Sequence, residues 1–238
     1  MSIAEKLTQV AENMQKVYDA GKAAGGFSDG YEAGQKAEYD RFWNAYQQNG
    51  NATDYQYAFA GSRWNAETFK PKYDLKPTNA WRMFYYATYN GDLQQLLDNA
   101  GVKLDTSNTT NFKEMFYWTY LTRIGVIDMR KATDTTSCFQ WTDGCVTIDK
   151  VIVSATTPFN NTFANCKKLA NLFIEGPIGQ NGFDVADCPL THDSLMSIIN
   201  ALEKMTSGTW TVTLGSSNLA KLTDAEKAIA TGKGWTLK

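Results

Sequence analysis

The chain has 238 residues, of which 43% are hydrophobic and 20% are charged, and its formal net charge is −2. This length allows one or two domains with a sizeable core, and the composition excludes a disordered chain. Because no lysine- or arginine-rich block occurs, the attraction that drives binding to nucleic acid or to an anionic membrane is absent, and we expect neither partner.

The first residues, Met-Ser-Ile-Ala-Glu-Lys-Leu, contain no basic region followed by an apolar run. We therefore expect no signal peptide, no membrane span and synthesis in the cytoplasm. The four cysteines are separated by 7, 21 and 22 residues, which matches no zinc pattern and suits buried or bystander reduced thiols: Cys138, Cys145, Cys166 and Cys188.

Residues 1–50 are predicted to form an N-terminal helical segment. Ser2 and Glu5 make a capping-box pair, and apolar residues then recur at steps of 4, 3, 4 and 3, as in a heptad seam: Ile3, Leu7, Val10, Met14 and Val17. Because so short a helix is marginal alone, residues 3–17 either pack on the rest of the chain or self-associate, and a homo-trimer is the assembly we expect.

A second helical face follows a glycine-rich stretch between Gly21 and Gly30. It carries Tyr39, Phe42, Trp43 and Tyr46. We interpret this aromatic face as a cover for the first unit of the repeat described next.

Short strand-like triplets with apolar ends recur from residue 70 onward. Their last residues lie 29, 25, 24 and 21 positions apart, and the triplets are residues 73–75, 102–104, 127–129, 151–153 and 172–174. Each triplet is followed by a turn-prone stretch and a phenylalanine at offsets of 9, 12, 10, 10 and 9: Phe84, Phe116, Phe139, Phe163 and Phe183. Tyr57-Ala58-Phe59 is an earlier, degenerate phenylalanine turn.

This period predicts an α/β leucine-rich-repeat solenoid over residues 51–190, with one parallel strand per coil. One strand and one turn cannot bury an apolar side alone, whereas stacked coils bury a continuous core that the phenylalanines fill. An α/β C-terminal cap is predicted over residues 191–238. Its elements are a helix from Thr191 to Met205, a strand from Trp210, a helix begun by Thr223 and a strand from Trp235 to Leu237.

The segment from Asn161 to Ile174 resembles the BspA-like leucine-rich repeat. It matches that family's pattern Phe-x-x-Cys-x-x-Leu-x-x-Leu-x-Ile throughout, at Phe163, Cys166, Leu169, Leu172 and Ile174. The other units match more loosely, and the earlier ones lack the cysteine. The N-terminal helix, with Ala-Glu-Lys-Leu and Ala-Glu-Asn, looks like the start of repeat proteins encoded by gut bacteria and their phages or prophages.

The resemblance implies binding to a glycan or a protein on a cell surface. A phage- or prophage-encoded tail-associated or host-recognition protein needs no export signal, because lysis releases it with the virion. The alternative is a bacterial cell-surface adhesin-like repeat protein, and an enzyme is the remote alternative. These expectations rest on the family and not on chemistry.

No motif for catalysis, metal binding or a cofactor was found in the sequence. His192 is the only histidine, and its place at the start of a helix suggests a surface or capping role. The carboxylates Asp143 and Asp149 fit a solvated turn better than a glycosidase pair. We therefore expect a protein that is not an enzyme and holds no cofactor.

Two surfaces are candidates for binding. The first is the outer face of the strands, formed by the middle residue of each triplet: Asp74, Lys103, Asp128, Ile152 and Phe173. Its opposite charges would attract across neighbouring strands. This face is either a ladder that fixes the strand register or a binding surface.

The second candidate surface consists of the aromatic residues that follow three of the phenylalanines: Tyr85, Tyr86, Tyr117, Trp118 and Trp141. Equivalent positions in stacked coils would place Tyr86, Trp118 and Trp141 in one row. The coil at Phe163 carries Ala164 and Asn165 there, so the scaffold does not require rings. The rings are either fillers of wider early coils or an exposed binding stripe.

Overall fold

The computed structural model describes residues 52–61, 67 and 69–238, all of which belong to one compact unit. The predicted N-terminal helices, including the seam over residues 3–17 and the aromatic face over 39–46, lie outside these residues. Within the described part the fold is mixed α/β with parallel strands. None of the described helices has both the length and the apolar character needed to cross a membrane.

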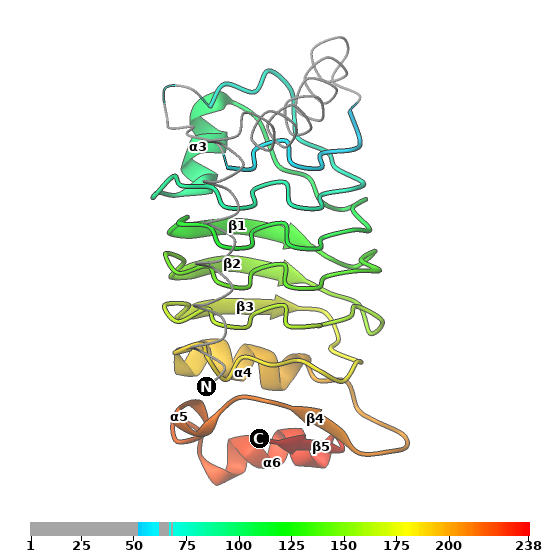
Figure 1. The fold of residues 1–238 in the computed structure, drawn as a ribbon. Coiled ribbons are helices and arrows are strands. Elements are labelled where there is room, and N and C mark those ends of the chain that lie inside the picture. The colour runs from blue at the N-terminus through cyan, green and yellow to red at the C-terminus, as the bar shows by residue number, and fades with distance from the viewer. Residues whose placement is uncertain (1–51, 62–66, 68) are drawn as a thin grey trace, which may run out of the picture. The chain divides into compact units, whose positions relative to one another are not determined.

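Three parallel strands form the central sheet, in the order β1 (Arg123–Asp128), β2 (Thr147–Ile152) and β3 (Asn171–Glu175) (Figure 1). Ile127 lies opposite Val151 in the first pair. An earlier parallel bridge joins Leu75 to Leu104. Every strand pairing in the described part of the chain is parallel, as the repeat predicts.

The register between β2 and β3 differs from the prediction. We expected residues 172–174 to align with residues 151–153, but Val151 pairs with Ile174 and Ile152 with Glu175. The buried residues of β2 are three positions apart, whereas those of β3 are two apart, so β2 contains a bulge. Burial of the apolar side chains, and not the position in the triplet, sets the register.

Helix α3 (Leu93–Ala100), which the sequence analysis missed, lies beside β1 (Figure 1). Its N-cap Asp92 accepts a hydrogen bond from the Gln95 amide, and Gly101 ends it in a left-handed conformation with φ 69°. No backbone bridge joins the triplet 102–104 to β1 among the described residues. Instead, the Thr106 hydroxyl accepts a hydrogen bond of 2.8 Å from the Asp128 backbone amide.

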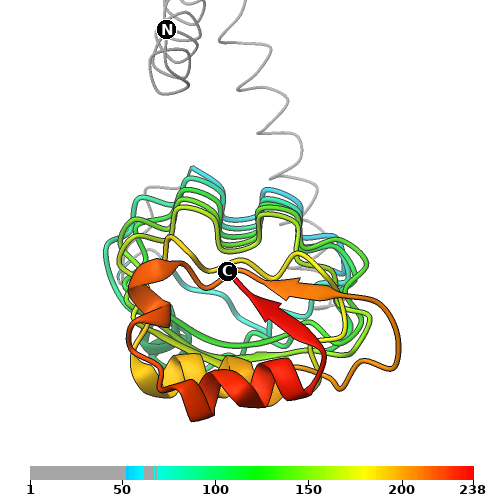
Figure 2. The ribbon, with the colours of Figure 1, turned by 90° about the horizontal axis from the view of Figure 1, so that it is seen from below.

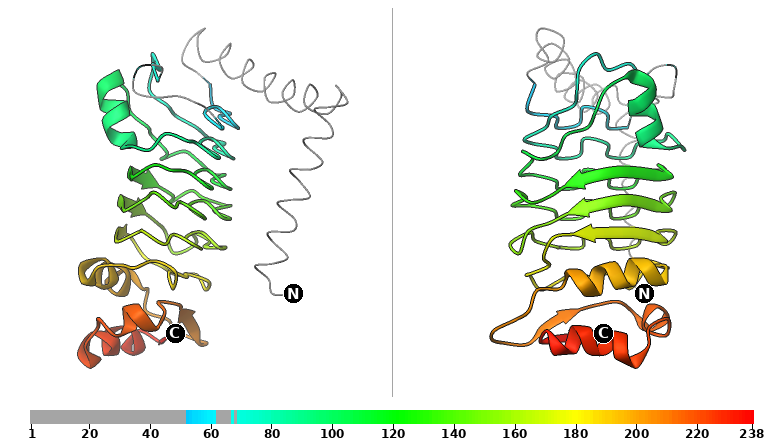
Figure 3. Two further views of the ribbon diagram at one scale, coloured as in Figure 1. Left: turned by 60° about the vertical axis from the view of Figure 1, so that its left-hand side comes forward. Right: turned by 180° about the vertical axis from the view of Figure 1, so that it is seen from behind.

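Five similar turns form the opposite side of the unit, and we call them the phenylalanine turns: residues 57–61, 82–86, 114–118, 137–141 and 161–165. The first and fifth residue of each turn have left-handed φ angles, and the third is a buried phenylalanine. In the first four turns, the backbone amide of residue one donates a hydrogen bond to the residue just before the next turn. The amides of residues three and five donate to the second and fourth residues of that turn, and all these bonds are 2.8–3.2 Å long. These bonds hold the turns in register, so they superimpose when viewed end-on (Figure 2) and lie one above another from the side (Figure 3).

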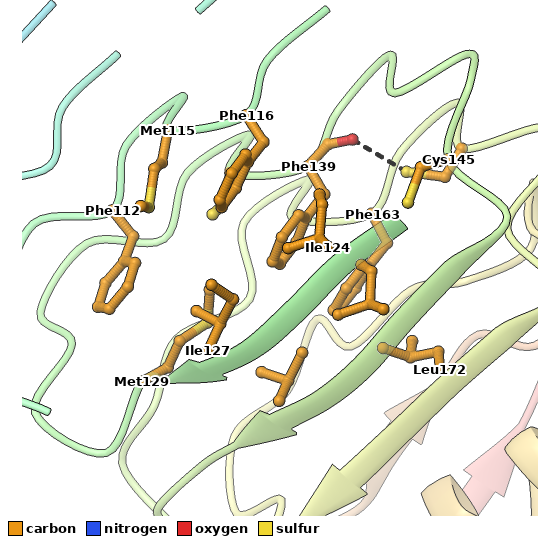
Figure 4. Packing of buried hydrophobic residues seen from close by; sticks show 14 of the residues in the cluster. Phe112, Met115, Phe116, Ile124, Ile127, Met129, Phe139, Cys145, Phe163 and Leu172 are labelled. Carbon is orange, nitrogen blue, oxygen red and sulfur yellow. Dashed lines mark hydrogen bonds between the residues drawn. The ribbon is translucent and has the colours of Figure 1, made fainter. Parts of the chain in front are cut away.

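The phenylalanines form a continuous column in the core (Figure 4). Phe116 and Phe139 have ring centroids 5.5 Å apart and nearly parallel planes, and Phe139 and Phe163 are 5.3 Å apart. The column extends to Phe84 and Phe59 at one end and to Phe183 at the other. The predicted phenylalanine column is therefore confirmed, including its degenerate first member at Phe59.

Helix α4 (His192–Ala201) covers the free edge of β3, in the place that a fourth strand would take (Figure 1). The Ser194 and Ser197 hydroxyls accept hydrogen bonds from the amides of Leu172 and Ile174, at 3.0 and 2.8 Å. An uncovered strand edge would offer these amides to another chain. The helix thus ends the sheet while satisfying its donors.

The C-terminal elements follow the predicted order. Thr191 caps α4, and after it come β4 (Trp210–Val212), α5 (Ser216–Leu219), α6 (Asp224–Gly232) and β5 (Trp235–Leu237). Thr223 and Glu226 form the predicted capping box of α6, and β4 pairs with β5 in parallel. The short helix α5 was not predicted.

Candidate functional site: an aromatic stripe

Tyr86, Trp118 and Trp141 occupy the fifth position of three consecutive phenylalanine turns, and we call them the aromatic stripe. The amides of Tyr86, Trp118 and Trp141 each donate to the carbonyl of the fourth residue in the next turn, at 2.9, 3.0 and 3.1 Å. The Tyr86 and Trp118 rings are 5.3 Å apart, and the Trp118 and Trp141 rings are 6.4 Å apart. The predicted row is therefore present, one ring per turn.

The rings of the stripe are not core residues. Tyr86 is 43% exposed and Trp118 is 39% exposed, while Trp141 is half-buried. The phenylalanine two positions before each of them is fully buried. Among the described residues the phenylalanines fill the core, and the exposure of Tyr86 and Trp118 favours the binding stripe over the filler interpretation.

Tyr85 and Tyr117, the fourth residues of their turns, stack beside the stripe. Their rings are 5.6 Å apart and nearly parallel, and both side chains are half-buried. Burial, together with the nearby carboxylate of Glu114, raises the pKa of Tyr117. Its hydroxyl therefore keeps its proton in neutral solution and can donate a hydrogen bond.

The backbone at the stripe is strained. Tyr86, Trp118 and Trp141 have φ angles of 55°, 55° and 61°, a region that costs a side-chain-bearing residue roughly 1–2 kcal/mol. The equivalent residues of the first and last turns are Gly61 and Asn165, which adopt this conformation at least cost. A Cβ at Gly61 would meet no heavy atom within 4 Å. The position therefore opens on free space and requires no ring.

Charged residues flank the stripe and mostly pair with one another. The Arg82 guanidinium donates to Glu114 and to the Tyr57 hydroxyl and lies 4.7 Å from the Tyr85 ring. These hydrogen bonds hold the Arg82 pKa above its ordinary value although burial alone would lower it. At the other end, the Lys167 ammonium lies 5.6 Å from the Trp141 ring. Sequence reasoning missed Arg82, because its partners are 25 and 32 residues away.

The second predicted surface, the outer face of the strands, does not form the expected row of charges. Asp74 accepts the Lys103 backbone amide at 2.9 Å, while its carboxylate lies 3.7 Å from the Lys76 ammonium. Asp128, the last residue of β1, forms an ion pair with Arg130, two residues further along the chain. Both aspartates therefore form ion pairs with side chains two residues away in the sequence, and not with side chains on the neighbouring strands.

The apolar end of that row is also interrupted. Because of the bulge in β2, Ile152 lies beside Glu175 and not beside Phe173. Phe173 remains 39% exposed on the outer face, and Ile152 is half-buried. The two apolar side chains are thus at different levels of the sheet and do not continue the expected row.

Three kinds of residue were considered for catalysis or metal binding: the histidine, the carboxylates and the cysteines. His192 is exposed, and its Nε2 lies 2.9 Å from Glu226, a contact between α4 and α6. Asp149 forms a bidentate pair with Arg123. The four cysteines are buried and free, as predicted, and burial raises the pKa of Cys145 to about 12. No group of three or more metal-ligating side chains occurs within residues 52–61, 67 and 69–238.

Comparison with protein-family models, with curated proteins and with solved structures finds no match to this chain.

Proposed function

We propose that this chain is a non-enzymatic binding protein whose ligand contacts the aromatic stripe. The observation that carries the proposal is that Tyr86, Trp118 and Trp141 combine exposure with a strained backbone. The left-handed φ belongs to the first and fifth residues of every turn, and glycine or asparagine would adopt it at lower cost. The aromatic residues at three of these positions therefore favour a purpose other than stability. Tyrosine and tryptophan are also the residues that dominate binding energy at interfaces.

The finer fold that we propose is a BspA-like leucine-rich-repeat solenoid, with one parallel strand per coil and an α/β C-terminal cap. The repeated parallel pairings and the column of phenylalanines support it. The unit from Phe163 to Ile174 carries the whole pattern of that repeat. In such a solenoid, helices α3 and α4 would replace the strand in the coils that lack one.

We propose a role in recognising a cell surface, as a phage- or prophage-encoded tail-associated protein that becomes part of the virion after lysis. The ligand would be a glycan or a protein. A bacterial adhesin-like repeat protein is the alternative, and neighbouring genes separate the two: tail and lysis genes against cell-wall genes. An enzyme remains the remote alternative.

Self-association through residues 3–17 belongs to the same proposal. A trimer would present three stripes at once, which raises avidity without new contacts. Light scattering of the full chain and of a form starting near residue 30 tests this. We expect a trimer and a monomer, respectively; two monomers at micromolar concentration would contradict self-association.

The binding role itself is tested by the adsorption of the labelled full chain to intact bacterial cells. Trp118→Asn should abolish adsorption, because it removes the central ring and installs the residue found at the same backbone position in the last turn. Phe173→Ala, which removes an equally exposed ring from the outer face of the sheet, is the control and should adsorb normally. Equal adsorption of the two variants would contradict binding through the stripe.

A further inference from the structure

We infer that the stripe binds an extended, uncharged polysaccharide whose chain runs along the stacked turns, with one sugar ring for each aromatic ring. This inference rests on the proposed function, since it needs the stripe to be the binding surface.

The repeat length follows from the spacing of the turns. Backbone hydrogen bonds hold the turns one strand spacing apart, about 4.8 Å, and the rings of the stripe are 5.3 and 6.4 Å apart. A ligand that touches all three rings must itself repeat at nearly this distance. One pyranose unit of an extended chain has comparable length. An extended peptide places alternate side chains on one face about 6.6 Å apart, so the spacing does not distinguish it from a sugar chain and the main-chain hydrogen bonds decide between them.

The stripe also lacks what a peptide strand needs. A peptide gains affinity by adding main-chain hydrogen bonds to a free strand edge. The amides of Tyr86, Trp118 and Trp141 already donate to the next turn, and the Tyr85 and Tyr117 carbonyls accept from the preceding one. The binding energy must therefore come from side chains.

The charges near the stripe disfavour a polyanion. A single-stranded nucleic acid or an acidic polysaccharide would need a row of available cations beside the rings. Arg82 is paired with Glu114, and Lys167 lies over Trp141 at the end of the row. The ligand is therefore better matched if it is neutral.

Neutral sugars match the remaining chemistry. The C–H face of a pyranose packs on an exposed aromatic ring, while its hydroxyls require donors and acceptors at the ring's edge. Tyr117 keeps its phenolic proton, Lys167 supplies ammonium donors beside Trp141, and Gln140 precedes Trp141 at the half-buried fourth position. Polar groups thus flank the rings at the level of the second and third sugar.

Adsorption to cells separates this inference from the proposed function. Cells are treated either with periodate, which cleaves vicinal diols of sugars, or with a broad protease, before the full chain is added. We expect periodate to abolish the adsorption that depends on Trp118, and protease to leave it unchanged. Adsorption lost only after protease would overturn the polysaccharide while leaving the binding role intact. Adsorption that does not depend on Trp118 would overturn both.

Calorimetry with oligosaccharides of known length tests the length and the neutral charge that we infer for the ligand. The probes are linear β-1,4-linked oligosaccharides of glucose and of mannose with two to six units, whose sugars carry the vicinal diols that periodate cleaves. Affinity should rise from two to about three or four units and then level off, and Trp118→Asn should weaken it at least about 30-fold while Phe173→Ala leaves it unchanged. No binding of any length, or affinity that falls steeply with added salt, would overturn the inference.

Discussion

Trp118 and Asn165 occupy the same left-handed position in their phenylalanine turns, with φ angles of 55° and 59°. Asparagine tolerates this conformation, whereas tryptophan is strained by it. We expect Trp118→Asn to change the free energy of unfolding by less than about 1.5 kcal/mol, because relief of roughly 1–2 kcal/mol of strain offsets the lost ring contacts. Urea denaturation measures this change.

The same substitution should weaken ligand binding by about 2 kcal/mol or more. Trp118→Phe is the matched variant, since it keeps a ring and the strain and should retain part of the affinity. A loss of stability of about 3–5 kcal/mol, as for a buried tryptophan, would show that Trp118 is a core residue and not a binding residue.

Phe139 lies between Phe116 and Phe163 in the core column, with no exposed surface. Phe139→Ala should lower the free energy of unfolding by about 3–5 kcal/mol, because it removes a buried ring and leaves a cavity. Chemical denaturation measures the loss. Phe173→Ala, in the exposed ring of β3, should cost much less. Similar losses for the two variants would contradict a column that holds the turns together.

The serines of α4 offer a test of how the sheet ends. Ser194→Ala removes the acceptor of the buried Leu172 amide and should cost about 1–3 kcal/mol, the penalty for an unsatisfied buried donor. Hydrogen exchange of the Leu172 amide should quicken, as should that of Ile174 in Ser197→Ala. Ser207→Ala, at an exposed serine, is the control. Unchanged exchange at both amides would mean that the helix protects the edge without these hydroxyls.

The pair formed by Asp128 and Arg130 predicts a dependence on acid. Hydrogen bonds from Arg130 hold the pKa of Asp128 below its ordinary value. Because the folded pKa is depressed, the pair stabilises the fold above the unfolded pKa of about 3.9, and this stabilisation is lost as the pH falls through the folded pKa.

Comparison of Asp128→Asn with the unaltered chain isolates this effect. The difference in unfolding free energy should be constant from pH 7 to about 5 and should shrink below about 3.9. Asp143→Asn serves as the control carboxylate. A difference that persists unchanged at pH 2 would show that the Asp128 carboxylate contributes by packing and not by charge.

The phenylalanine column and the parallel pairing were predictable because both recur with the repeat. Phe84, Phe116, Phe139 and Phe163 are all buried, as the shared offsets predict. The caps Thr191 and Thr223 were also predictable, since capping uses local sequence. Repetition and local chemistry are the two signals that a single sequence carries most clearly.

Other features depend on contacts that the sequence does not display. The 29-residue spacing of the first two triplets suggested a wider coil, but the extra residues form α3. Asp92, the buried Leu93, Leu96 and Leu97, and Gly101 were the signal that was overlooked. The left-handed positions could not be recognised, because the chain places tyrosine, tryptophan, arginine and glutamate there. The left-handed conformation of these residues is visible only in the backbone.

The insertion of α3 shows which side of this chain can change in length. Phe84 and Phe116 are 32 residues apart, whereas Phe116 and Phe139 are 23 apart, yet both pairs of turns keep the same three backbone hydrogen bonds. Additions on the strand side are therefore absorbed as a helix, while a single residue added inside a turn would shift its donors out of phase. We expect divergent versions of this chain to vary in length on the strand side rather than in the turns. The aromatic stripe can lengthen or shorten only by a whole turn, which would change the length of the ligand that we propose for it by one unit.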